Sequence, residues 1–356
     1  MANEIEKVNS IAIGDIEKVS SRTDDNIQAI NGREFTGATA YTVHSFTSDG
    51  ELDVSSGGVI DFLVVGGGGG GGDASSNGAG GGGAGGMISS ALTSTVDDDG
   101  VEHGPWTIAA GVYTIQVGAG GAAGASNNSG GNGGNGSYIK GKAGETFTNY
   151  ICAVYGGGGG GAGSGGSSGS SFAGSSGHQA GGYGGCSGGA SQSSGNTYGG
   201  AYLVIANDHG RDVSDASAGW PNDYYDFSES ESGRTDAGWF GGGSDSLGTV
   251  GAGGGGAGGR GEKGENPDGG EGGAPRANSF RTGSPVYYSA GGPGVSNGDW
   301  HANADASGRG ASPDNSGYGG AGNAVGTGTG GSGIVVIRYI TGAVSATGGT
   351  VTTYSA

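Results

Sequence analysis

The chain has few of the features that would mark a disulfide-stapled, exported or membrane-spanning protein. Its 356 residues include two cysteines, Cys152 and Cys186, which allow one disulfide but do not make a disulfide framework. The apolar runs are far too short to cross a bilayer as a helix. The polar N-terminus MANEIEKVNS carries no recognisable signal peptide. We therefore expect synthesis in a cytoplasm, no classical export route and no membrane insertion.

Charged residues are also scarce, and those present are mostly acidic. They make up 13% of the chain, with 14 Lys and Arg residues and a formal net charge of −19. Such a surface repels nucleic acid and anionic membranes, so neither is an expected ligand. The five histidines show no metal-ligand spacing. Residues 165–169 match the hydrolase pattern G-x-S-x-G, but a Gly/Ser tract matches it by chance. We predict no catalytic residue, metal or cofactor, and hence no enzyme.

Glycine is abundant instead, with 95 residues in runs that directly follow strand-like segments. The stretch VIDFLVVGGGGGGG, at residues 59–72, joins a β-branched pattern to seven glycines. The same change recurs at residues 150–161 and is mirrored at residues 326–339. A flexible linker has no reason to be joined to a core strand three times. Polyglycine II helices do have one, because bare Cα atoms let neighbouring helices approach and bond through their backbones.

The apolar segments read as strands rather than helices. Residues 112–117 alternate between the two faces of a sheet, and the same type of pattern covers residues 41–47. Further strands are expected at residues 52–54, 59–65, 87–96, 106–117, 202–205 and 334–339, and a strand pair is expected at residues 137–155. The predicted fold is all-β, a jelly-roll-like sandwich with inserted, packed polyglycine II helices.

Three regions follow from the changes in composition. Residues 1–36 have few glycines and are too short to fold alone, so they are interpreted as an attachment and oligomerisation arm. Residues 37–341 form the glycine-rich domain, and residues 342–356 a β-prone C-terminal tail. In the glycine-rich domain, GGRGEKGEN carries glycine at every third position, the period of a three-fold helix with one packed face.

The ordered blocks YTVHSFTSDGELDV, VIDFLVVGGGGGGG, WTIAAGVYTIQVGAGG and GGSGIVVIRY resemble the glycine-rich domain of phage virion proteins. They are most similar to tail-fibre or tail-tip proteins of marine and cyanobacterial phages. The arm, with KVNSIAIGDIEKV, looks like the leader of such proteins. The order of blocks also resembles the glycine-rich domain of anaplastic lymphoma kinase, which implies a tumour-necrosis-factor-like sandwich. The resemblance covers residues 37–341.

This resemblance implies a virion structural protein, and we expect a tail-fibre or receptor-binding adhesin that contacts a host glycan or outer-membrane protein. The arm would bind other virion proteins and form a homotrimer. The main alternative is a non-adhesive capsid-fibre, decoration or neck protein; a polysaccharide depolymerase comes third.

Aromatic residues crowded among acids and serines are the best candidates for a binding surface, because their rings suit sugar faces and protein partners. The candidate receptor-binding residues are Trp220, Tyr224, Tyr225, Trp239, Phe240, Tyr287, Tyr288 and Trp300. The alternative is that these rings cap the glycine helices, which have no side chains of their own. Both roles can hold for different rings.

Overall fold

The computed structural model is all-β in the part of the chain that it describes. This part comprises residues 39–73, 78–90, 105–125, 130–141, 150–154, 156–161, 185–186, 188–189, 250–264, 269–295, 314–322 and 328–356, and the backbone of six two-residue strands before residue 35. These residues contain no helix, and every pair of neighbouring strands is antiparallel.

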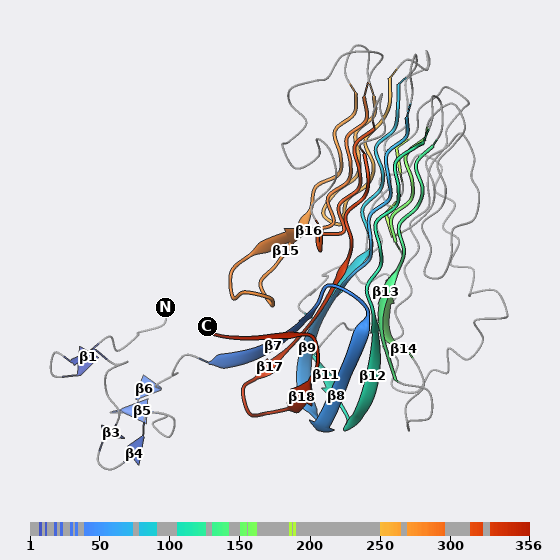
Figure 1. Cartoon of the computed structure of the whole chain (residues 1–356). Helices are drawn as coiled ribbons and strands as arrows, with labels where there is room; N and C mark the ends of the chain where they lie inside the picture. The colour runs from blue at the N-terminus through green and yellow to red at the C-terminus, as the bar shows by residue number, and fades with distance from the viewer. Residues whose placement is uncertain are drawn as a thin grey trace.

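Two antiparallel sheets form a sandwich (Figure 1). One sheet has the strand order β10-β9-β17-β7-β19, with β11 paired to β9. Its strands are β7 (Ala40–Phe46), β9 (Gly58–Val65), β10 (Met87–Ser89), β11 (Trp106–Ile108), β17 (Ile334–Ile340) and β19 (Thr350–Ser355). The other has the order β14-β13-β12-β8-β18. Its strands are β8 (Gly50–Ser56), β12 (Gly111–Gln116), β13 (Ser137–Gly141), β14 (Tyr150–Val154) and β18 (Ser345–Thr347).

The main hydrophobic core lies between these two sheets. Alternation places Tyr113 and Ile115 of β12 on the inner face, as the sequence pattern predicts. The first sheet contributes every second residue of its central strands, among them Phe62 and Ile337. Both sheets thus bury one face against the other, and the predicted all-β sandwich is confirmed.

One strand prediction needs correction. Residues 106–117, expected as one strand, form β11 and β12, which belong to different sheets. The break falls at residues 109–110, just before Gly111, whose φ of 150° is unusual for residues with a side chain. Residues 342–356, expected as a β-prone C-terminal tail, contain β18 and β19, with one strand in each sheet. The segment expected at residues 87–96 is described as a strand for Met87–Ser89, and residues 202–205 lie outside the described residues.

Extended glycine segments follow β9 and precede β17 directly in the chain. They stand above the sandwich in Figure 1. Successive residues of the segment 66–72 donate their backbone N–H groups to three neighbouring segments in turn, and every third residue donates to the same segment. Residues 66, 69 and 72 bond to the segment 80–86 at 2.8–3.0 Å, and the other positions bond in turn to Asn135 and Asn132 and to the segment 328–331. Three directions repeating every three residues are the property of a polyglycine II helix.

The carbonyl groups of the same helix accept from three further segments. Gly67 and Gly70 accept from the segment 156–161, Gly68 and Gly71 from the segment 118–124, and Gly69 accepts from Gly320. The helix at residues 66–72 therefore has six hydrogen-bonded neighbours, three through its N–H groups and three through its carbonyls. This is the arrangement of close-packed rods, and we call the set of packed glycine segments the glycine bundle.

Close backbone packing explains why glycine is required. A Cβ added at Gly68 would lie 1.9 Å from the carbonyl oxygen of Tyr318, and one at Gly70 would lie 2.0 Å from that of Ala122. The triplet segment follows the same rule at the surface of the bundle. Its glycines Gly261 and Gly264 are buried while Glu262 and Lys263 between them are exposed. The predicted role of the three-residue glycine period is confirmed here.

We expect the substitution Gly68→Ala to destabilise the protein by about 3 kcal/mol or more, because the clash is with backbone that other hydrogen bonds hold in place. The matched control is Ala122→Ser, at an exposed position of a neighbouring glycine segment, which should change stability by less than about 0.5 kcal/mol. Chemical denaturation measures both. Equal, small effects would contradict the close packing of the bundle.

Candidate interaction surface

The hairpin of β15 (Arg276–Asn278) and β16 (Val286–Tyr288) carries the two described members of the predicted binding surface. The sequence analysis treated this region as an aromatic loop, and the structure instead forms two short paired strands. Register places Tyr288 opposite Arg276 and Tyr287 opposite Ala277. Successive residues of a strand point to opposite faces, so the two tyrosines have opposite environments.

Tyr288 is 1% exposed and belongs to a second core cluster on the outer face of the six-stranded sheet. The cluster contains Val43, Leu63, Val65, Met87, Ala257, Phe280, Tyr288, Ile334 and Val336. Burial raises the pKa of Tyr288, and nearby Arg281 partly offsets that rise. The prediction of Tyr288 as a receptor-binding residue is therefore corrected. Its ring caps the sheet and cannot meet a partner.

Tyr287 is 58% exposed, in keeping with the predicted surface role. The other candidates, Trp220, Tyr224, Tyr225, Trp239, Phe240 and Trp300, lie outside the described residues. Their segments nevertheless have defined starting and ending points. Gly189 bonds to Gly81 and Gly161, and Gly251 bonds to Val295, which in turn pairs with Ala79. These contacts lie at the end of the bundle farthest from the sandwich.

Chain direction follows from these contacts. Residues 66–72 run away from the sandwich, and residues 80–86 return to it. The segment 190–249 therefore leaves the described structure and re-enters it at the far end of the bundle. The segment that contains Trp300 leaves from the same end, after Val295. The structure thus brings together both ends of the segment 190–249 and the start of the segment that contains Trp300. The latter segment re-enters the described structure near the sandwich, where Gly317 bonds to Gly85 and Ser332.

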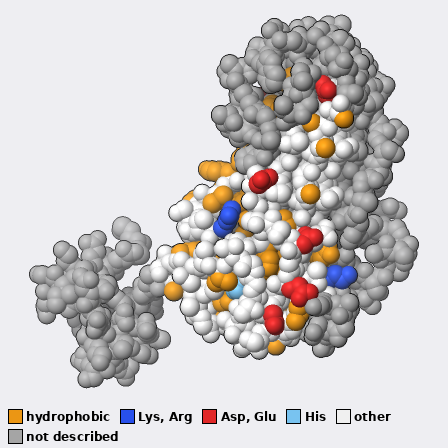
Figure 2. Space-filling view, viewed as in Figure 1, with side chains coloured by type: hydrophobic (Ala, Val, Ile, Leu, Met, Phe, Trp, Pro, Cys, Tyr) orange, Lys and Arg blue, Asp and Glu red, His pale blue; other side chains and the backbone are white. Residues whose placement is uncertain are grey.

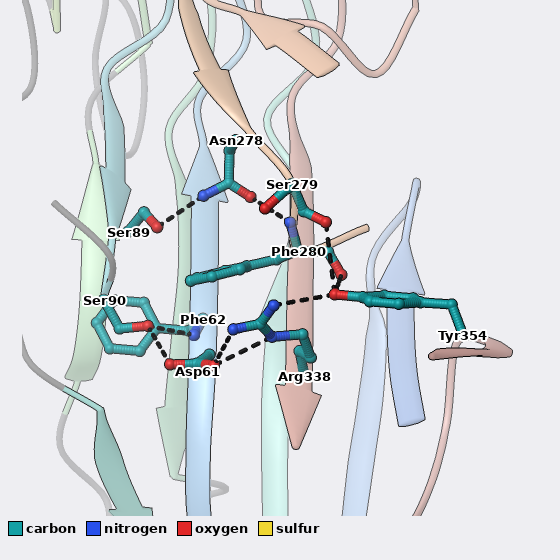
Figure 3. A network of polar contacts seen from close by, with 9 residues as sticks. All are labelled: Asp61, Phe62, Ser89, Ser90, Asn278, Ser279, Phe280, Arg338 and Tyr354. Atoms are coloured by element: carbon teal, nitrogen blue, oxygen red, sulfur yellow. Dashed lines mark hydrogen bonds and ion pairs between the residues drawn. The ribbon is translucent and has the colours of Figure 1, made fainter. Parts of the chain in front are cut away.

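A polar network fixes the hairpin to the sheet (Figure 3). Arg338 of β17 forms an ion pair with Asp61 of β9, its direct register partner, and donates to the Tyr354 hydroxyl at 2.9 Å. The second Asp61 oxygen accepts from Ser90 at 3.0 Å. The guanidinium carbon lies 4.0 Å from the ring centre of Phe280 in the hairpin loop and 4.3 Å from that of Tyr41. Arg338 therefore links the sheet to the hairpin through stacking as well as through charge.

Further hydrogen bonds complete this attachment. Asn278 donates its side-chain amide to Ser89 of β10 at 2.8 Å and accepts from the backbone N–H of Phe280 at 2.8 Å. Burial alone would lower the pKa of Arg338, but its hydrogen bonds to Tyr354 and Asp61 raise it, so the guanidinium stays charged. The sequence analysis missed this anchor. The signal was present, since Asp61 and Arg338 are single charges within the apolar strands VIDFLVV and IVVIRYI.

No metal-binding cluster is seen among the described residues. They contain no group of three or more His, Cys, Asp and Glu side chains placed to hold a metal ion. His44 is buried, donates from Nδ1 to the Gly348 carbonyl at 2.7 Å, and accepts at Nε2 from the Tyr339 hydroxyl at 2.9 Å. Both ring nitrogens are thus used in the core.

Both cysteines are buried, and neither forms a disulfide. Burial raises the pKa of the Cys152 thiol far above its ordinary value, which disfavours the reactive thiolate. In the described ranges no helix has the length and apolarity to cross a membrane.

The described part of the visible face is mostly backbone and side chains that are neither charged nor hydrophobic (Figure 2). Acidic side chains are scattered over it, and hydrophobic side chains form small, separate groups in this view. The described surface in this view therefore offers isolated apolar contacts rather than one continuous apolar patch.

These observations define an all-β sandwich that carries a bundle of polyglycine II helices. The profile of the glycine-rich domain family matches residues 46–340, which is more than half of the chain, so the chain belongs to that family. A comparison with curated proteins found no match.

Replacing Arg338 by methionine should lower stability by about 2–3 kcal/mol, because Asp61 is left partly buried without its partner. It should also speed amide hydrogen exchange in residues 276–288 more than in β12, because the hairpin loses its main attachment. Arg260→Met removes the same charge at an exposed position and serves as the control. Unchanged exchange in the hairpin would contradict the anchoring role.

The two tyrosines of β16 should respond in opposite ways to truncation. Tyr288→Ala should destabilise the protein by about 3–5 kcal/mol through the cavity it leaves. Tyr287→Ala should change stability by less than about 1 kcal/mol. Thermal and chemical denaturation of both variants test this assignment, and similar losses would show that the hairpin face is assigned wrongly.

Proposed function

We propose that the chain is a phage virion structural protein that acts as a tail-fibre or receptor-binding adhesin. The observation that carries this proposal is the polarity of the molecule. In the six-stranded sheet, Val65 and Ile334 lie beside the glycine bundle, whereas Tyr41 pairs with Ile340 at the opposite end. The arm joins β7 at that opposite end, next to Ala356.

This polarity suits a molecule that attaches at one end and presents loops at the other. A run such as residues 66–72 spans about 22 Å at roughly 3.1 Å per residue, so the bundle separates the two ends. Both ends of the segment 190–249, and the start of the segment that contains Trp300, lie at the far end of the bundle. Surface loops on a rigid support can vary without loss of the fold, as recognition of a host surface requires.

The proposed partners are compatible with this arrangement. Residues 1–36 would bind other virion proteins and hold a homotrimer, and the aromatic segments would contact a host glycan or outer-membrane protein. The resemblance to phage tail proteins supports this proposal at the level of sequence blocks. Localisation on the virion, the absence of enzyme activity and the host partner are parts of the same proposal.

Trp220→Ala and Trp239→Ala test the receptor surface. If these rings contact the host, each variant should weaken adsorption by about 1–3 kcal/mol with little change in melting temperature, as at an interface hot spot. If they cap the bundle, melting temperature falls while the affinity of the folded fraction stays constant. Tyr288→Ala is the control for a capping ring, and loss of stability without loss of binding would contradict the receptor role.

Antibody labelling of particles separates the adhesin from its alternative. Label at the tail tip supports the adhesin, and label on the capsid or neck supports a decoration or neck protein. Release of reducing sugar from host envelope would instead support a depolymerase.

A further inference from the structure

The N-terminal arm is built from three hairpins with the same spacing. They are β1 (Lys7–Val8) with β2 (Ile11–Ala12), β3 (Lys18–Val19) with β4 (Arg22–Thr23), and β5 (Ala29–Ile30) with β6 (Arg33–Glu34). The outer pairs are Lys7 with Ala12, Lys18 with Thr23, and Ala29 with Glu34. Each pair is displaced by 11 residues from the one before it, so the backbone repeats with a period of 11.

The sequence has the same period. IEKV at residues 5–8 recurs as IEKV at residues 16–19 and as IQAI at residues 27–30. The two-residue connection that follows is Asn-Ser, Ser-Ser and then Asn-Gly, all of them turn-forming residues. The sequence analysis missed this repeat. Agreement between two independent periods, one in sequence and one in backbone register, identifies a tandem repeat.

A single unit of this kind cannot be stable by itself. In the described backbone each hairpin is its own two-stranded sheet and pairs with neither of the others. An isolated two-stranded hairpin is at best marginally stable in water, and repeat units gain stability from contacts with similar units. Each hairpin has two-residue strands with both outer edges unpaired in the described backbone. The arm therefore needs a partner surface that repeats with the same spacing.

We propose that this partner is the same arm of other copies of the chain, aligned unit against unit. A copy supplies the matching spacing at every unit, whereas a surface with another period would lose register after the first one.

This inference rests on the oligomerising arm of the proposed function but not on the virion setting. It gives that arm a mechanism in which the number and phase of the 11-residue units set the strength of association. The spacing between units is the more specific feature, because association through a structureless tether would not depend on that spacing.

Analytical ultracentrifugation of the full chain and three deletions tests the proposal. Removing residues 18–28 deletes one unit and keeps the others in phase, so the oligomer should persist with an affinity lower by about tenfold. Removing residues 18–23 breaks the phase and should abolish association as fully as removing residues 1–38. Thermal unfolding of the glycine-rich domain should be the same in all variants.

Three results would overturn the proposal: a monomeric full chain at all concentrations, an oligomer that survives loss of residues 1–38, or equal effects of the two internal deletions. None of these depends on host adsorption or particle labelling. A protein that oligomerises in phase but is absent from virions would contradict the proposed function and leave the repeat mechanism standing.

Discussion

Hydrogen bonds between glycine backbones are the interaction on which the rest of this molecule depends. A helix such as residues 66–72 has no internal hydrogen bonds, so it is stable only if its N–H and C=O groups find partners on neighbouring helices. Those partners lie close enough only when side chains are missing. A Cβ added at Gly68, for example, would lie 1.9 Å from the carbonyl oxygen of Tyr318. The large entropy that glycine loses on ordering must be offset by this shared network and by the sandwich that fixes its ends.

The sandwich provides that fixed end. Gly66 follows β9 and Gly333 precedes β17, two adjacent central strands whose register is set by cores on both faces. Ser137, at the start of β13, donates to the Val65 carbonyl at 2.6 Å and accepts from Gly118 at 2.8 Å. The place where strands become glycine helices is thus tied across both sheets. The bundle in turn needs no core of its own, which explains how a chain with so few apolar residues folds.

Much of this architecture was predictable from the sequence, because strand alternation and glycine periodicity are local properties. Tyr113 and Ile115 face the core as expected, and Gly261 and Gly264 face the bundle. The hairpin of β15 and β16 was not predictable, since three-residue strands form there only through tertiary contacts to Arg338 and Ser89. The difference between Tyr287 and Tyr288 depends on strand register, which composition does not reveal. The 11-residue repeat was visible in the sequence but needed the hairpin register to interpret it.

Amide hydrogen exchange in the glycine bundle is the most direct test of this account. If residues 66–72 are bonded on all sides, their amides should exchange as slowly as those of β9 and β17, because they open only when the whole domain unfolds. A flexible glycine linker would instead exchange at the rate of an unprotected peptide. Protection of residues 66–72 equal to that of the central strands is the predicted result, and unprotected exchange there would contradict the account.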